Sequence, residues 1–172
     1  MCRNPDQCAA QAQSLANAMQ QWAPVGQAEL MKWRAAYKAY EGDVVMKHHG
    51  YVRCEDREFT PAEIMEAMMN GKVIERFQRR WQRGVVYKTG RPPVEVNLLI
   101  SYELPIAEGE QAERRNHRQS RSRKRTGSSG RYVHISVVFP PGSMNWTITT
   151  VYRPTDKEWR WNNDYTSRQC WC

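Results

Sequence analysis

The chain has 172 residues, and its 26 lysines and arginines against 18 aspartates and glutamates give a formal net charge of +8. This length suffices for one ordinary domain with an appendage, and the positive charge favours an anionic partner. No apolar run approaches the roughly 18–20 residues that span a membrane, and no basic start leads into a continuous apolar stretch. We therefore expect no membrane-spanning segment and no classical signal peptide in this chain.

Residues 1–43 are expected to form a helical N-terminal region. Residues 5–22 and 27–41 are rich in Ala, Gln and Met, and a break with Pro and Gly separates them at residues 23–26. This region is interpreted either as a leader before the C-terminal domain of a delivered effector or as a helical cap on a sheet. Its apolar contacts are expected from Trp22, Leu30, Trp33, Ala36, Tyr37 and Tyr40.

Residues 47–57 carry the most informative functional pattern. His49, Arg53 and Arg57 follow one another at intervals of four. On an α-helix they would lie within about 80° of each other, because each residue advances the helix by about 100°. An imidazole can transfer a proton at neutral pH, and fixed guanidinium groups stabilise charge on phosphorus, so the pattern suits phosphodiester chemistry. The alternative is a solvated helix face with local ion pairs.

A second, short helix is predicted directly after this motif. Thr60 suits the N-cap, Pro61 the first helical position, and Glu63 completes a capping box. Gly71 is expected to end the helix, and strand character begins at 72–75. The apolar residues of the helix repeat at helical spacing: Ile64, Ala67 and Met68.

The remainder of the chain predicts strands. Short turns follow the first of them at 89–93 and the third at 140–143. We therefore expect an α+β domain over residues 44–172, with the N-terminal helices packed on a 3–5-stranded antiparallel sheet. The strands are expected at Val85–Lys88, Val94–Tyr102, Tyr132–Phe139 and Asn145–Tyr152.

A basic insertion is expected at residues 107–131, and its residues 114–131 carry the whole net charge of the chain. Within it, residues 114–131 hold eight basic residues and no acidic one, so removing them leaves 18 basic against 18 acidic residues. The segment is rich in Ser and Gly and is expected to be a disordered loop. Such a loop would bind RNA phosphates, or instead an acidic protein, or would only aid solubility. Its RNA-binding candidates are Arg114, Arg115, Arg118, Arg121, Arg123, Lys124, Arg125 and Arg131.

Together these pieces resemble a toxin-like domain family grouped with the RelE- and MqsR-type ribonuclease toxins. That family carries a His-x-x-x-Arg-x-x-x-Arg helix, a short helix ending in Asn-Gly, and a last strand reading roughly Ile-Thr-Val-Tyr. The corresponding segments here are His49–Arg57, Met69–Glu75 and Ile148–Tyr152, within a likeness that covers about residues 45–155. Gly50 stands where the family usually has a small residue such as Ala. The resemblance implies a barnase/EndoU/colicin/RelE-type fold, whose members are mostly metal-independent endoribonucleases.

The resemblance also implies roles for five residues. His49 would act as general base or acid, and Arg53 and Arg57 would stabilise the phosphorane. Thr150 and Tyr152 would position the substrate, although both are also simply good strand formers. Cleavage through the ribose 2′-hydroxyl would leave a 2′,3′-cyclic phosphate and would need no cofactor and no metal.

Strand alternation is expected to place Thr150 and Tyr152 on the same face as Trp146 and Ile148. The identity of the proton carrier stays open at this point. His48 and His134 are alternatives to His49 for proton transfer.

The cysteines near the two ends of the chain are ambiguous. They would bind zinc, form disulfides or remain free thiols: Cys2, Cys8, Cys170 and Cys172. Cys54 lies alone within the helix motif, and the expected mechanism uses no thiolate.

The expected function is therefore that of a bacterial toxin that cleaves RNA, with tRNA as one candidate substrate. A toxin of this kind would act in the bacterial cytoplasm, including that of a target cell after delivery. It would require a cognate immunity protein or antitoxin, expected to be acidic. The alternatives are a non-catalytic RNA-binding or assembly protein that uses the arginine-rich loop, and a DNA-directed nuclease.

Overall fold

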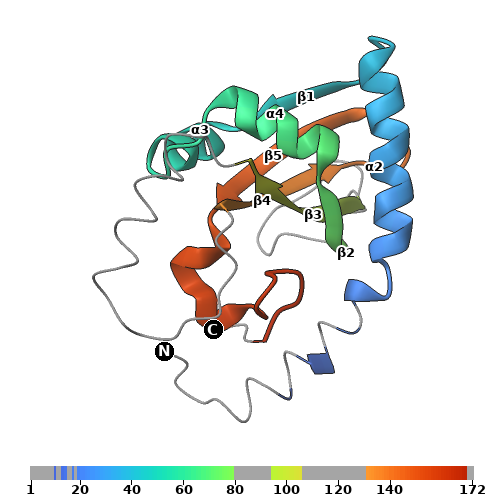
Figure 1. Cartoon of the computed structure of the whole chain (residues 1–172). Coiled ribbons are helices and arrows are strands. Elements are labelled where there is room, and N and C mark those ends of the chain that lie inside the picture. The colour runs from blue at the N-terminus through green and yellow to red at the C-terminus, as the bar shows by residue number, and fades with distance from the viewer. Residues whose placement is uncertain are drawn as a thin grey trace, which may run out of the picture.

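The computed structural model of the chain describes residues 19–79, 94–105 and 131–169, together with Ala10, Gln13, Ser14 and Asn17. Helices pack on one sheet, and the expected α+β class is confirmed (Figure 1). The predicted strand at Val85–Lys88 and nearly all of the insertion at 107–131 lie outside the described residues. Within the described ranges, no helix combines the length and the apolar character needed to cross a membrane.

Five strands of the described residues form the sheet in the order β1-β5-β4-β3-β2. Neighbouring strands from β2 to β5 are antiparallel, whereas β1 runs parallel to β5. The expectation of a purely antiparallel sheet is therefore wrong at this edge, because β1 has only four residues, too few for a recognisable alternation. The strands are β1 (Asp43–Met46), β2 (Lys72–Arg79), β3 (Glu95–Leu104), β4 (Arg131–Phe139) and β5 (Asn145–Tyr152).

The helix α2 (Ala23–Lys38) starts where the sequence predicted a break, so the break at residues 23–26 is wrong. Pro24 lies in the first turn, where its missing N–H costs no hydrogen bond. Gly26 is needed for close packing, because a Cβ there would lie 2.8 Å from Cδ2 of Leu98. The preceding helix expected over 5–22 lies largely outside the described residues.

The apolar contacts predicted for this helix are observed within α2 but not beyond its ends. Leu30 and Trp33 are fully buried against the sheet, and Tyr37 is partly buried beside them. Trp22 and Tyr40 are 48% and 97% exposed, so their predicted core contacts are wrong. Both lie outside the ends of the helix and therefore off its apolar face. Residues 23–38 form a helical cap packed on the sheet.

The helix α4 (Pro61–Asn70) confirms the predicted capping box. The Thr60 hydroxyl accepts a hydrogen bond from the Glu63 N–H, and the Glu63 carboxylate accepts one from the Thr60 N–H. The helix ends before Gly71 as expected, but Gly71 has an extended backbone with φ −68°. Glycine is required here by close packing, since a Cβ would lie 2.5 Å from the Ala67 carbonyl oxygen.

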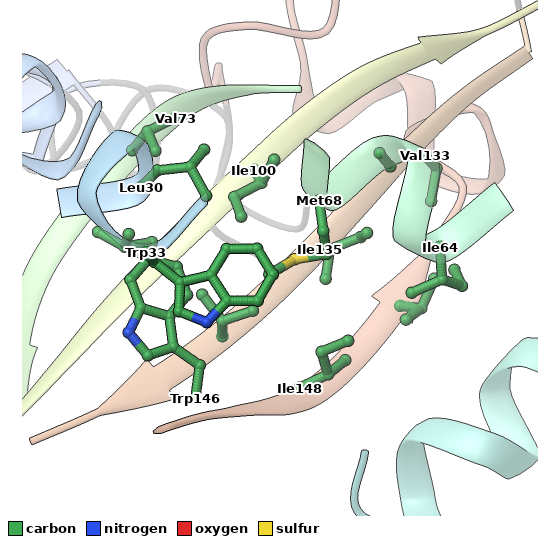
Figure 2. Packing of buried hydrophobic residues seen from close by; sticks show 14 of the residues in the cluster. Leu30, Trp33, Ile64, Met68, Val73, Ile100, Val133, Ile135, Trp146 and Ile148 are labelled. Carbon is green, nitrogen blue, oxygen red and sulfur yellow. The ribbon is translucent and has the colours of Figure 1, made fainter. Parts of the chain in front are cut away.

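The main hydrophobic core lies between one face of the sheet and the helices α2 and α4 (Figure 2). Trp33 of α2 stacks on Trp146 of β5, with ring centroids 5.1 Å apart, and Phe139 stacks on Trp146 at 4.2 Å. A smaller cluster covers the opposite face of the sheet and combines sheet residues with the segment after β5. It consists of Ile74, Leu99, Trp161 and Tyr165.

Candidate functional site

A cleft of about 290 Å³ opens between the short helix α3 (His48–Glu55), the end of β5 and the segment that follows β5. That segment begins with the 3₁₀ helix η1 (Pro154–Arg160), which lies near the same end of β5 (Figure 1). The cleft brings together all five residues to which the sequence assigned a catalytic role: His49, Arg53, Arg57, Thr150 and Tyr152. Its other lining residues are Arg153, Pro154, Asp156, Lys157, Arg160, Trp161 and Arg168.

The helix α3 lies along the edge of β5 that β1 leaves unpaired. β1 ends at Met46, and the Lys47 N–H then donates to the Ile148 carbonyl oxygen at 3.2 Å. Gly50 is buried in this contact, and a Cβ at this position would lie 2.7 Å from Cγ of Met46. The glycine therefore allows the helix to approach β1 and β5 closely, which sets α3 beside the cleft.

Arg57 does not lie on the helix, contrary to the expectation of a third helical turn. α3 ends at Glu55, and Arg57 lies in the turn after it, where its N–H donates to the Cys54 carbonyl oxygen at 3.2 Å. Its side chain nevertheless reaches the cleft. Nη1 donates to the Val151 carbonyl oxygen at 2.7 Å, and Nε lies 3.5 Å from Oδ2 of Asp156. Arg57 thus binds the free edge of β5 while keeping its charge at the cleft.

The two other residues of the motif are more open to solvent. His49 is exposed and lines the cleft, whereas His48, also exposed, is not among its lining residues. Arg53 is partly exposed, and its Nη1 lies 3.5 Å from Oδ2 of Asp56. An imidazole and a guanidinium from consecutive turns therefore face the same space.

A β-bulge decides which side of β5 faces the cleft. Ser136 of β4 pairs with Thr150, but the next residue of β4 pairs with Ile148, so Thr149 is an extra residue in β5. Its hydroxyl donates to the Ser136 carbonyl oxygen at 3.1 Å. Trp146 and Ile148 are buried in the main core, whereas Thr150 and Tyr152 line the cleft. The expectation that all four share one face is therefore wrong, because the extra residue reverses the alternation.

Behind the cleft, His134 of β4 contacts Tyr152 across the strands. Nδ1 of His134 and the Tyr152 hydroxyl oxygen are 3.3 Å apart, in a hydrogen bond whose direction depends on the imidazole tautomer. His134 is fully buried, and burial lowers its pKa to about 3. Burial also raises the pKa of the Tyr152 phenol. Both side chains are therefore neutral near pH 7, and His134 reaches the cleft only through Tyr152.

The segment after β5 supplies a second wall that the sequence did not predict. Arg168 pairs with the buried Glu75 of β2, with Nε 2.5 Å from Oε1, and its guanidinium lies 4.6 Å from the Trp161 ring centroid. Burial raises the pKa of Glu75 despite this pairing. Arg153 donates to the Arg57 carbonyl oxygen at 2.5 Å. These contacts fix the wall against both the sheet and the end of α3.

The only sequence signal for this wall was its composition. Between β5 and the end of the described chain, one arginine lies between two tryptophans in the run Trp159-Arg160-Trp161. A 3₁₀ helix and irregular chain have no periodic pattern that would mark them as part of a site.

Positive charge dominates the cleft. Among its lining residues, six carry a permanent positive charge, His49 adds an imidazole, and Asp156 is the one carboxylate. Such a surface attracts and holds anions, phosphate groups above all. Among the described residues, no group of three or more His, Cys, Asp or Glu side chains is placed to hold a metal ion.

The remaining candidate residues lie away from the cleft or outside the described residues. Arg131 lies on β4 and forms an ion pair with Glu63 of α4. The other seven basic residues assigned to RNA binding, between 114 and 125, are outside the described residues, as are the four terminal cysteines. Cys54 is buried, with Sγ 3.7 Å from Sδ of Met46, and burial raises the pKa of its thiol.

In comparisons with known proteins, no family model, no curated protein and no solved structure matches this chain.

Proposed function

We propose that the protein is a metal-independent endoribonuclease of the toxin type. The observation that carries this proposal is the cleft itself, which joins His49 and Arg53 of α3 to Thr150 and Tyr152 of β5. These segments are about 100 residues apart in the sequence, and the fold brings them together at one cleft. A proton carrier, fixed positive charge and two hydroxyl groups around one open space are the parts that RNA cleavage requires.

The chemistry follows from the place of each group. The 2′-oxygen of a bound ribose attacks the adjacent phosphorus while its proton passes to the His49 imidazole. The bond from phosphorus to the 5′-oxygen breaks, and the leaving oxygen takes up a proton from water in the open cleft. The products are a 2′,3′-cyclic phosphate and a 5′-hydroxyl end. The nucleophile belongs to the substrate, so the reaction needs no metal-activated water.

The arginines have distinct tasks in this mechanism. Arg57 is held by the Val151 carbonyl oxygen, so its charge is fixed at the cleft, and we assign it to stabilise the phosphorane. Arg53 is more exposed and binds the phosphate as it enters. A preorganised guanidinium stabilises developing negative charge without having to reorient during the reaction.

Tyr152 and Thr150 position the substrate. The raised pKa of Tyr152 keeps its phenol protonated, so the hydroxyl can form hydrogen bonds but carries no charge that would repel phosphate. Thr150 presents a second hydroxyl on the same side of β5. A toxin of this kind acts in the bacterial cytoplasm, and an acidic inhibitor protein would complement the positive cleft.

The experiment that tests the proposal uses two neighbouring histidines. Total RNA and a defined tRNA set are incubated with the purified protein in EDTA, beside His49→Ala and the matched control His48→Ala. We expect His49→Ala to lose about 10²–10⁴-fold in cleavage rate, as is typical for a general acid or base, and His48→Ala to retain activity. Mass spectrometry of the fragments should show 2′,3′-cyclic phosphate ends.

Three other outcomes would contradict the proposal or its assignment of His49. Intact RNA with tight, salt-sensitive binding would indicate a non-catalytic RNA-binding protein. Metal-dependent nicking of plasmid DNA would indicate a DNA-directed nuclease. Equal loss of activity in both histidine variants would remove His49 from its assigned role.

A further inference from the structure

The positive charges of the cleft are unevenly compensated. Four of its arginines each have a carboxylate partner within 3.5 Å, namely Asp56 for Arg53, Asp156 for Arg57, Glu58 for Arg153 and Glu75 for Arg168. Lys157 and Arg160 line the same cleft, and neither forms an ion pair with any residue that the structure describes. The uncompensated permanent charge of the cleft therefore lies on η1, opposite the helix motif.

An exposed tryptophan lies between these two cations in the chain. Trp159 is 40% exposed and lies beside the cleft without lining it, and the guanidinium of Arg160, which does line the cleft, is 5.1 Å from its ring centroid. Unpaired bases stack on exposed aromatic rings and on guanidinium groups, while lysine binds phosphate as a point charge. One short segment thus combines an aromatic surface with two available charges.

The Arg160 side chain also has a buried donor, its Nε, without a hydrogen-bond acceptor among the described residues. A buried donor without a partner is rare in a native fold and calls for an explanation. A phosphate group that drew the Arg160 side chain toward the cleft would bring this guanidinium to an acceptor.

We propose that Lys157, Trp159 and Arg160 form a nucleotide subsite beside the position of the scissile phosphate. Trp159 stacks on an unpaired base, and the two cations bind the phosphate next to the one that is cleaved. The proposal rests on the endoribonuclease function and specifies its substrate as single-stranded RNA bound through at least two consecutive phosphates. A paired duplex would not fit the subsite, because its bases are already stacked on one another.

The test measures binding separately from cleavage. 2′-O-methyl RNA lacks the nucleophilic hydroxyl, so it binds without being cut. Isothermal titration calorimetry compares a dinucleotide, a tetranucleotide and a paired duplex for the wild type, Lys157→Ala and Trp159→Ala. The matched control is Lys32→Ala, an exposed lysine on α2 that is not part of the cleft. Lys157 and Trp159 are both exposed, so these variants should fold, and circular dichroism checks this.

We expect the wild type and Lys32→Ala to bind the tetranucleotide more tightly than the dinucleotide and than the duplex. Trp159→Ala should lose about tenfold in tetranucleotide affinity, the range measured for removal of one stacking partner. Lys157→Ala should lower the slope of log affinity against log salt by about 0.7, the value for one single-strand phosphate.

Failure of the subsite and failure of the proposed function give different results. If the variants keep the full gain from dinucleotide to tetranucleotide, or if the wild type shows no such gain, the subsite does not exist. If the gain is present and is lost in the variants while the wild type leaves cleavable RNA intact, the subsite stands and the catalytic proposal fails.

Discussion

The two faces of the sheet bury different kinds of side chain. On one face, α2 and α4 cover a continuous cluster of buried apolar residues, with the stacked rings of Trp33, Trp146 and Phe139 near its centre. On the other face, only four buried apolar residues of the described chain gather, and charged or ionisable side chains such as Glu75 and His134 are buried among them. The cleft opens at the margin of this second face.

This difference indicates that one face mainly stabilises the fold and the other mainly orders the cleft. Apolar burial is favourable and tolerant of position, so the helix-covered face is suited to stabilise the fold. A buried ion pair contributes little net stability, but it fixes its partners in place. The second face therefore orders the cleft wall at Arg168 and Trp161, and it should be sensitive to the loss of single polar partners.

The largest effect on stability is expected from Trp33→Ala on the helix-covered face. Trp33 is fully buried and stacked on Trp146, so its truncation should lower the free energy of unfolding by about 3–5 kcal/mol. Urea denaturation measures this change. Trp22→Ala, at a half-exposed position, should cost about 1 kcal/mol or less. Equal losses in the two variants would show that the apolar cluster does not dominate stability.

A smaller loss is expected from Glu75→Gln on the second face. The carboxylate is 3% exposed and pairs with Arg168, so its neutralisation removes a buried ion pair and leaves a polar amide in a site built for a charge. The free energy of unfolding should fall by about 2–4 kcal/mol. Asp56→Asn, which breaks the exposed pair with Arg53, should cost about 1 kcal/mol or less.

The most gradual effect is a pH dependence from His134. Its pKa is about 3 in the fold and 6.5 as a free side chain, so between these values the unfolded chain binds one more proton. This contribution to stability is complete above pH 6.5 and is lost as the pH falls toward 3. Wild type should therefore lose stability more steeply than His134→Phe between pH 7 and 4, by up to about 1.4 kcal/mol per pH unit. Urea titrations at each pH, with exposed His48→Phe as control, measure the difference.

The elements with strong local signals were predicted well from sequence. The capping box at Thr60 and Glu63 fixed the start of α4, and the strand predicted after the turn at 140–143 has the observed bounds of β5. The motif also selected residues that meet at one cleft. Local hydrogen bonds and strand patterns depend on neighbouring residues, so they can be recognised without tertiary information.

What the sequence missed depends on contacts between distant segments. Arg57 leaves the helix and binds the Val151 carbonyl oxygen, which no spacing rule includes. The run Pro154–Arg160 forms a wall only because Trp161, Tyr165 and Arg168 after it pack on the second face of the sheet. Such placements are set by packing and by ion pairs across the fold, and they leave no periodic trace.

Because of the extra residue in β5, the cleft depends on the number of residues in this strand as well as on their identity. Deleting Thr149 would restore an unbroken alternation in β5. On one side of the deletion, every side chain would then move to the opposite face of the sheet. Either Thr150 and Tyr152 would turn into the core, or Trp146 and Ile148 would turn out of it, although no cleft residue had been replaced. Any related chain should therefore be aligned on β5 with this position kept as an insertion, because a gapless comparison of alternating strands would match cleft residues to core residues.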